Sequence, residues 1–235
     1  DSTGAEVEPN GRYFNNDVTM VVTVTERNFD ADATLFRING QQVSLNGMTH
    51  VGDSSAGGNG DGDTHTYEYR FTGDEANDKD YTVEYVSCTD KAGNVSDSTV
   101  IPQTFTVDKV QPTVSANDAA GYSSSALTYT ATVTERNFDE AGAKVLVTKH
   151  LNGSLSYENR EYPVIWNTSG DTHTAALSFA EDGDYSFTIT CTDKAGNPQA
   201  AVYTSKEFTV DNVDPVISSN ISEDNYNIAN KGDIN

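Results

Sequence analysis

Residues 127–134 read LTYTATVT, so that apolar or aromatic side chains alternate with threonine along the whole stretch. Residues 185–191, YSFTITC, alternate in the same way. A two-residue period places one set of side chains on a buried face of a β-strand and the other on an exposed face. No segment of comparable length shows the 3.6-residue stripe of a helix. Short strands separated by turns rich in Gly, Asn and Asp predict an all-β chain of tandem antiparallel β-sandwiches with negligible helix.

The sequence contains two copies of one pattern. The matching segments, in the same order in both copies, are TERNFD at 25–30 and 134–139, DTHT at 63–66 and 171–174, CTDKAGN at 88–94 and 191–197, and FTVD at 105–108 and 208–211. A Val-x-Pro linker follows each FTVD, at 110–112 and 213–215. A repeat of this length predicts one domain per copy. We therefore expect sandwiches at 1–109 and 110–212, and the opening segment of a third repeat at 213–235.

One strand differs in length between the copies. Residues 81–88, YTVEYVSC, are one residue longer than residues 185–191, and their apolar phase changes between Tyr85 and Val86. An extra residue in one strand of an antiparallel pair is accommodated as a β-bulge. We predict a bulge in the first copy and none in the second.

A strand ending in TDKAGN, followed by FTVD and a Val-x-Pro linker, resembles the bacterial immunoglobulin-like repeats of bacterial surface proteins and adhesins. The resemblance covers both copies and the segment after them. Residues 182–185, DGDY, are similar to the tyrosine corner of immunoglobulin-like domains. The resemblance implies an immunoglobulin-like fold and an extracellular position on a bacterial surface, with attachment to the cell wall through regions outside this chain.

The composition excludes several kinds of partner. The chain carries 36 acidic and 14 basic residues, for a net charge of −22. Nucleic acid and anionic membranes repel such a charge, and no apolar run approaches the roughly 18 residues of a membrane helix.

Cys88 and Cys191 occupy matching positions in consecutive copies, which cannot come within the roughly 7 Å that a disulfide requires. We expect two free, buried thiols.

Acidic and amide side chains are concentrated in the repeated loops. In an immunoglobulin-like sandwich the loop after strand B and the turn before strand G lie at the pole where the chain enters, so in the second copy they face the linker. Carboxylate and amide oxygens at a negatively charged junction are ligands that Ca²⁺ prefers. The predicted Ca²⁺ ligands at the inter-domain junction are Asp108, Glu135, Asp139, Asp193 and Asn197. The equivalent pole of the first copy carries Glu26, Asp30, Asp90 and Asn94.

Two explanations without a metal compete with this one. The aspartate of Asp-x-Ala-Gly-Asn can cap a turn in which glycine adopts positive φ. Arg27 and Arg136 lie inside the acidic motif and can neutralise a carboxylate through a bidentate pair.

A lysine–asparagine cross-link, as in some Gram-positive surface sandwiches, needs matching inward lysines, whereas Lys91 and Lys194 lie in the predicted exposed turn. We expect no cross-link.

The sequence carries no pairing of nucleophile and base, histidine cluster or cofactor fingerprint. His65 and His173 recur in step with the repeat, which favours a structural role. We therefore expect a non-enzymatic stalk or adhesin segment whose partners are neighbouring repeats of the same chain. In an alternative, the sandwiches themselves bind a host ligand such as an immunoglobulin, another glycoprotein or a glycan. In a second alternative, they are the accessory region of a surface enzyme.

Overall fold

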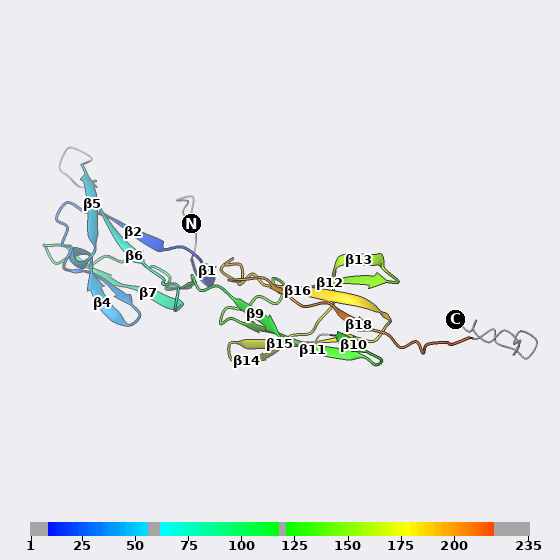
Figure 1. Cartoon of the computed structure of the whole chain (residues 1–235). Helices are drawn as coiled ribbons and strands as arrows, with labels where there is room; N and C mark the ends of the chain where they lie inside the picture. Colours follow the sequence, from blue (N-terminus) through cyan, green and yellow to red (C-terminus); the bar gives the residue numbers. More distant parts are fainter. Residues whose placement is uncertain (1–8, 56–61, 118–120, 219–235) are drawn as a thin grey trace, which may run out of the picture.

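The computed structural model describes residues 9–55, 62–117 and 121–218, and these form the all-β architecture predicted from the sequence. Residues 12–107 build two facing sheets (Figure 1). The five-stranded sheet contains, in spatial order, β1 (Arg12–Phe14), β8 (Gln103–Val107), β7 (Lys79–Cys88), β3 (Thr34–Ile38) and β4 (Gln41–Ser44). The three-stranded sheet contains β2 (Val18–Thr25), β6 (Thr64–Phe71) and β5 (Thr49–Ser54), and a 3₁₀ turn spans Leu45–Gly47.

Residues 113–210 build a second pair of sheets. The larger sheet contains, in order, β10 (Gly121–Ser123), β18 (Phe208–Val210), β16 (Gly183–Thr190), β12 (Lys144–Leu151) and β13 (Ser154–Glu161), with β17 (Tyr203–Thr204) also paired to β16. The smaller sheet contains β14 (Asn167–Ser169), β15 (Thr172–Phe179), β11 (Leu127–Thr134) and β9 (Thr113–Ala116).

Both sandwiches follow the strand order of immunoglobulin-like domains, although the described strands of the first include no counterpart of β9. In the second sandwich β9-β11-β15-β14 corresponds to A-B-E-D, and β18-β16-β12 corresponds to G-F-C. In each sandwich a short N-terminal strand pairs in parallel with the last strand, β1 with β8 and β10 with β18. The tyrosine corner is present as predicted, because the hydroxyl of Tyr185 donates to the carbonyl of Glu181 at 2.9 Å.

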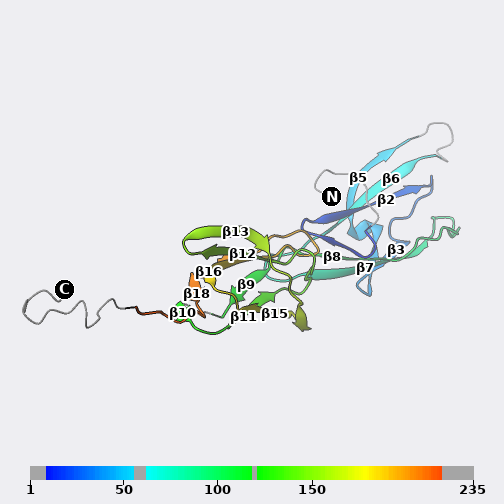
Figure 2. The ribbon, with the colours of Figure 1, turned by 90° about the vertical axis from the view of Figure 1, so that its right-hand side faces the viewer.

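The two sandwiches follow one another end to end, as the two views in Figures 1 and 2 show. β8 ends at Val107 and β9 begins at Thr113, so the linker between them is short. Within the described ranges, no ladder pairs a strand of one sandwich with a strand of the other. Of the predicted third repeat, residues 213–218 form no strand, and residues 219–235 lie outside the described residues.

Each sandwich has its own apolar core. The second core has 16 buried members and the first has eight, the remaining apolar side chains of the first being only partly buried. In the second core the ring of Tyr129 lies 5.2 Å from Phe187 and 4.7 Å from Phe208. Because burial of apolar surface drives folding at about 25 cal/mol per Å², the second sandwich has the stronger driving force.

The predicted difference between the two matching strands is confirmed. β3 pairs Leu35 with Ser87 and Phe36 with Tyr85, which leaves Val86 as the extra residue of a bulge. The ladder between β12 and β16 runs without a register shift. The chain therefore accommodates the insertion locally and keeps the rest of the strand in register.

Both cysteines are free, as predicted. Cys191 is fully buried, but the predicted burial is wrong for Cys88, which is half-buried. Cys88 is the last residue of β7, at the end of the smaller core, and its sulfur lies 3.1 Å from the hydroxyl of Thr34. The smaller core thus covers this strand end less completely.

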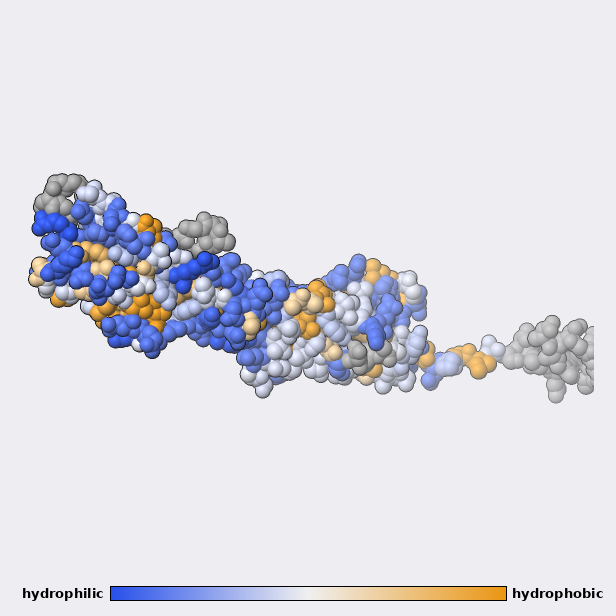
Figure 3. Space-filling model, turned by 60° about the vertical axis from the view of Figure 1, so that its left-hand side comes forward, coloured by the Kyte–Doolittle hydropathy of each residue, from blue (hydrophilic) through white to orange (hydrophobic). Residues whose placement is uncertain are grey.

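In Figure 3, hydrophilic side chains cover the region where the two sandwiches meet, whereas apolar patches are visible on the first sandwich. In the part of the chain that the structure describes, no helix is long and apolar enough to cross a membrane.

Candidate metal centre at the junction of the sandwiches

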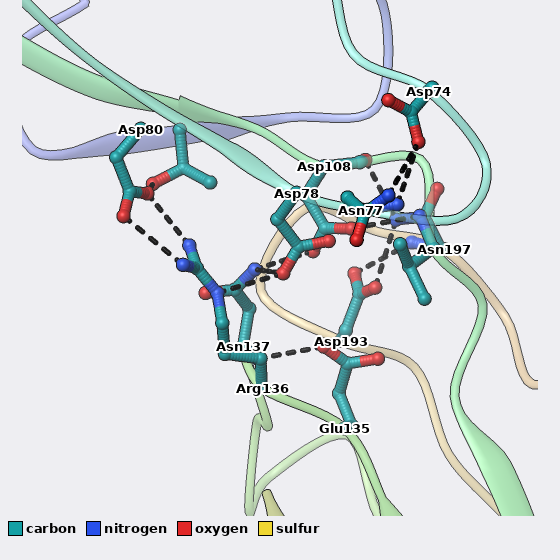
Figure 4. Close-up of polar contacts among 12 residues, drawn as sticks. Asp74, Asn77, Asp78, Asp80, Asp108, Glu135, Arg136, Asn137, Asp193 and Asn197 are labelled. Atoms are coloured by element: carbon teal, nitrogen blue, oxygen red, sulfur yellow. Dashed lines mark hydrogen bonds and ion pairs between the residues drawn. The ribbon is translucent and has the colours of Figure 1, made fainter. Parts of the chain in front are cut away.

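Asp108 is the first residue of the linker, and it is fully buried. Its backbone N–H donates to the carbonyl of Phe14 at 2.8 Å, and its Oδ1 accepts the N–H of Val110 at 2.9 Å. These bonds fix the linker and leave the second carboxylate oxygen directed at the following sandwich (Figure 4).

The loop after β11 places Asn137 against that carboxylate. The Asn137 side-chain amide donates to Oδ2 of Asp108 at 2.8 Å and to Oδ2 of Asp78 at 2.7 Å. The loop is held in shape because Glu135 Oε1 accepts the backbone N–H of Asn137 at 2.7 Å. His173 supports it from behind, with Nε2 2.8 Å from the carbonyl of Glu135. One amide thus joins two carboxylates of the first sandwich.

The turn after β16 supplies a second bond to the linker. Asn197 stabilises the turn by donating its backbone N–H and its side-chain amide to the carboxylate of Asp193, at 2.8 and 2.9 Å. The same amide donates to the carbonyl of Asp108 at 2.9 Å. Gly196 has a φ of 88°, which favours glycine at this position. Both loops at the entry pole of the second sandwich therefore contact Asp108.

Arg136 connects the sandwiches through a pair of aspartates that precede β7 or lie in it. Its guanidinium donates to both oxygens of Asp80, at 2.7 and 3.1 Å, and to Oδ2 of Asp78 at 2.9 Å. Thr106 orients Asp80 by donating to Oδ1 at 2.8 Å. The hydrogen bonds from Arg136 hold the pKa of Asp80 below its usual value, and the same pairing raises the pKa of Arg136.

Three carboxylates meet beside this arginine. One oxygen each of Asp78, Asp108 and Glu135 lies within 4.8 Å of the other two. Glu135 is 3% exposed, and the side chain of Asp78 is 5% exposed. Oδ1 of Asp78 and Oε2 of Glu135 are buried without a hydrogen-bond partner. A buried carboxylate oxygen without a partner costs free energy, so this cluster is incomplete without a proton or a cation.

The raised pKa values of these carboxyl groups also indicate that the cluster lacks a positive charge. Burial raises the pKa of Glu135 from 4.5 to about 7, and the charges of Asp108, Asp193 and Asp78 add to the effect. Burial and contact with Asp108 raise the pKa of Asp78 from 3.8 to about 6, although Arg136 opposes this. Burial also raises the pKa of Asp193. Arg136 therefore compensates only part of the negative charge.

The donor set suits a hard divalent cation. Ca²⁺ binds carboxylate and carbonyl oxygens at about 2.3–2.6 Å and accepts irregular coordination. Two ligand oxygens on one such ion can be up to about 5 Å apart, which the 4.8 Å limit of this cluster satisfies. Oδ1 of Asp78 stays available because Arg136 and Asn137 both donate to Oδ2. Oε2 of Glu135 stays available because the Asn137 N–H donates to Oε1. Asp78, Asp108 and Glu135 can therefore hold a cation while the arginine pair stays intact.

The structure brings together most of the residues predicted from the sequence. Asp108 contacts Asn197, and Glu135 is close enough to Asp193 for the charge of Asp193 to raise the pKa of Glu135. Asp139 is different, because its Oδ1 accepts the backbone N–H of Ala141 at 3.1 Å within its own loop, and it is not part of the three-carboxylate cluster.

Sequence reasoning missed Asp78, Asp80 and Asn137. A signal for the aspartates was present, since Asp-x-Asp-Tyr occurs at 78–81 and again at 182–185. The motif lies at the exit pole of its own sandwich, so its role appears only when two sandwiches are placed end to end. Asn137 lies inside the repeated TERNFD segment, and no signal in the sequence distinguishes it from its charged neighbours.

The equivalent residues of the first copy form the same local turns. Asn94 donates its backbone N–H and its amide to Asp90, both at 2.8 Å, and Glu26 Oε1 accepts the N–H of Asn28 at 2.8 Å. Asp30 accepts the N–H of Asp32 at 3.0 Å. The turn-capping explanation is therefore correct for these local bonds, while the bonds across the junction are additional.

No protein-family model matches the chain, and no curated protein matches its sequence. Among solved structures, the chain is similar to bovine butyrophilin, with 12% identity and a TM-score of 0.36 over 87% of this chain and 95% of that one. It is similar to the adhesin InvE of Yersinia pseudotuberculosis, with 14% identity and a TM-score of 0.31 over 85% of this chain and 56% of that one. It is also similar to dimeric latent PorU from Porphyromonas gingivalis, with 14% identity and a TM-score of 0.28 over 90% and 19%. The strand order and register define the fold.

Proposed function

We propose that this chain is a non-enzymatic tandem immunoglobulin-like segment of a bacterial cell-surface protein, and that it acts as a stalk holding a binding region away from the cell. The observation that carries the proposal is the junction, by which we mean Asp78, Asp80 and Asp108 of the first sandwich with Glu135, Arg136, Asn137, Asp193 and Asn197 of the second. A flexible linker needs no such bonds between the modules that it joins.

The junction sets the angle between the sandwiches because its polar groups are buried. Asp108 and Asn137 are both buried and bonded to each other. Bending the joint separates them, and each buried polar group left without a partner costs about 1–3 kcal/mol. The bonds of Asn197 and Arg136 break in the same movement. The joint therefore resists bending.

Spin labels on the two sandwiches test this rigidity. The labels are placed at two exposed strand positions, Val51→Cys in β5 and Leu155→Cys in β13, with Cys88→Ser and the buried Cys191 left unchanged. Double electron–electron resonance should give one narrow distance distribution. The change Asn137→Ala should broaden it. A distribution that is already broad in the unmodified junction would contradict the stalk proposal.

Within this function, the cation at the junction is Ca²⁺. Asp78 Oδ1, Glu135 Oε2 and an oxygen of Asp108 are its protein ligands. Of the set expected from the sequence, this one keeps Asp108 and Glu135, adds Asp78, and leaves out Asp139, Asp193 and Asn197. A cation that binds only the folded joint stabilises it by RT ln(1 + [L]/Kd). Removal of Ca²⁺ with a chelator should lower the thermal midpoint, and Mg²⁺ should restore less of it because Mg²⁺ demands stricter octahedral geometry. Equal midpoints with and without chelator would contradict the assignment.

A second candidate function is binding of a host ligand by the sandwiches themselves. Tyr122 and Ile165 of the second sandwich are 90% and 80% exposed, and exposed aromatic and aliphatic side chains of this kind serve as anchors in interfaces. Capture of one serum or mucus glycoprotein by the chain, lost in Tyr122→Ser with Ile165→Ser, would support this function. Retained capture in that variant would exclude these anchors.

A further inference from the structure

The hairpin of β5 and β6 places three metal-ligating side chains in contact with one another, outside the junction. Nε2 of His50 and Nδ1 of His65 lie 2.9 and 2.8 Å from the same oxygen, Oδ1 of Asp53. His50 and Asp53 belong to β5, and His65 belongs to β6. Because the three residues are spread over two strands, no short sequence motif marks this cluster.

A bulge in β5 brings His50 and Asp53 to the same face of the sheet. In a regular strand, side chains three positions apart point to opposite faces. Here His50 is paired with Tyr67 and Asp53 with His65, and the register shifts between His50 and Gly52. A bulge of this kind re-aims the side chains that follow it. Tyr67 and His65 are two positions apart on β6 and share a face, so their partners on β5 share it too.

The contacts of His65 require a positive charge next to Asp53. Nε2 of His65 lies 2.9 Å from the carbonyl oxygen of Glu26, which can only accept, so Nε2 carries a proton. In the neutral ring Nδ1 then has a lone pair, and it lies 2.8 Å from a carboxylate oxygen that also has only lone pairs. The charge that joins these two atoms is either a second proton on the ring or a metal cation.

The matching histidine of the second sandwich has no such requirement. His173 forms the same bond, with Nε2 2.8 Å from the carbonyl oxygen of Glu135. Its Nδ1 lies 2.9 Å from the hydroxyl of Thr168, which can donate a proton to it. Thr168 is paired with His173 across the strands as Asp53 is paired with His65. The aspartate therefore distinguishes the first copy from the second at this position.

We propose that His50, Asp53 and His65 form a Zn²⁺ site, with Nε2 of His50, Nδ1 of His65 and a carboxylate oxygen of Asp53 as ligands. Imidazole nitrogen and carboxylate oxygen both bind Zn²⁺, and sites with three protein ligands keep a fourth position for water. The other nitrogen of His65 donates to a carbonyl, as is usual for histidines that bind a metal. Ca²⁺ prefers ligands that are all oxygen, so this site and the junction select different ions.

The three side chains are accessible to an ion from solution. Those of His50 and Asp53 are 46% and 54% exposed, and that of His65 is 20% exposed. Zn²⁺ lies about 2.0–2.2 Å from its ligands, so Asp53 must turn its oxygen away from its place between the two nitrogens. β5 is an edge strand, and exposed side chains on it can turn without a change in the core. Binding releases protons from the two rings.

Calorimetric titration of the metal-free, untagged chain with ZnCl₂ tests the proposal. The titration is performed at about pH 7.5, where free imidazole is mostly neutral, and in excess CaCl₂, which competes for the junction carboxylates. The chain should bind one Zn²⁺. In NMR spectra of the chain with ¹⁵N-labelled histidine, Zn²⁺ should shift the ring resonances of His50 and His65 and leave those of His150 and His173 unchanged.

Three variants separate this site from the junction. Asp53→Thr introduces the residue of the second copy, whose hydroxyl can donate to His65, so it should keep the fold and lose the Zn²⁺ site. His50→Ala should also lose the site, whereas Asp78→Asn, which changes only the junction, should keep it. Absence of Zn²⁺ binding to the natural chain, or equal binding by Asp53→Thr, would overturn the proposal and show that a proton alone joins His65 to Asp53. Neither result bears on the stalk function, which the spin labels test independently.

Discussion

Replacement of Glu135 by Gln separates the two contributions of the acidic cluster, the cost of its buried charge and its affinity for a cation. Glu135 Oε1 accepts the Asn137 N–H, and Oε2 has no partner. Glutamine retains an acceptor for the first bond and removes the charge. The pKa of Glu135 rises from 4.5 to about 7 on folding. At pH 8 the carboxylate is ionised in both states, and at about 1.4 kcal/mol per pH unit its burial costs about 3 kcal/mol.

The variant should therefore be more stable than the natural chain in chelator at pH 8, by up to about 3 kcal/mol. Ca²⁺ should reverse that advantage. At a free concentration of 100 times Kd the natural chain gains about 2.7 kcal/mol. If loss of the charged ligand weakens binding 100-fold, the variant gains only about 0.4 kcal/mol at the same concentration.

Urea unfolding at pH 8, with chelator and with Ca²⁺, measures all four free energies of unfolding. The control is Glu26→Gln, because Glu26 has the same local bond to Asn28 but lies at the entry pole of the first sandwich. This control should leave the stabilisation by Ca²⁺ unchanged. The reasoning is refuted if Glu135→Gln and the natural chain gain equally from Ca²⁺, or if the variant is less stable in chelator.

Arg136→Ala should destabilise the chain by about 1–2 kcal/mol in urea unfolding, because it removes the guanidinium that pairs with the buried carboxylate of Asp78. The control Arg37→Ala breaks an exposed ion pair and should cost under about 0.5 kcal/mol. In chelator, stability should rise as the pH falls from 8 to 5, because the raised pKa values of Glu135 and Asp78, about 7 and about 6, mean that the folded state takes up protons before the unfolded state does; a flat profile of urea midpoints would count against the raised values. Cys191, fully buried with its pKa raised to about 12 mainly by burial, should react with a thiol reagent only on unfolding, and rapid reaction in the folded chain would contradict its placement.

The sequence predicts the fold well because strand phase is local. The alternation at 127–134 and 185–191 appears directly in the buried positions of β11 and β16. The extra residue in 81–88 appears as the bulge at Val86. Each of these features depends only on neighbouring residues and one paired strand.

The junction could be predicted only in part because it depends on how two sandwiches are oriented. Asp108 and Glu135 were found from their repeated motifs. Asp78 was missed because it comes from the opposite pole of its own sandwich. The sequence also presents arginine and Ca²⁺ as alternatives, whereas in the structure Arg136 uses Oδ2 of Asp78 and leaves Oδ1 without a partner. The two can act together on one carboxylate.

Calorimetric titration of the metal-free chain with CaCl₂ tests the central claim most directly, that the joint between the sandwiches is a cation site. Asp78 and Asp182 are matched residues, one inside the junction and one at the free exit pole. The natural chain should bind one Ca²⁺ strongly, Asp78→Asn should lose that site, and Asp182→Asn should keep it. Absence of binding to the natural chain, or equal binding by both variants, would contradict the claim.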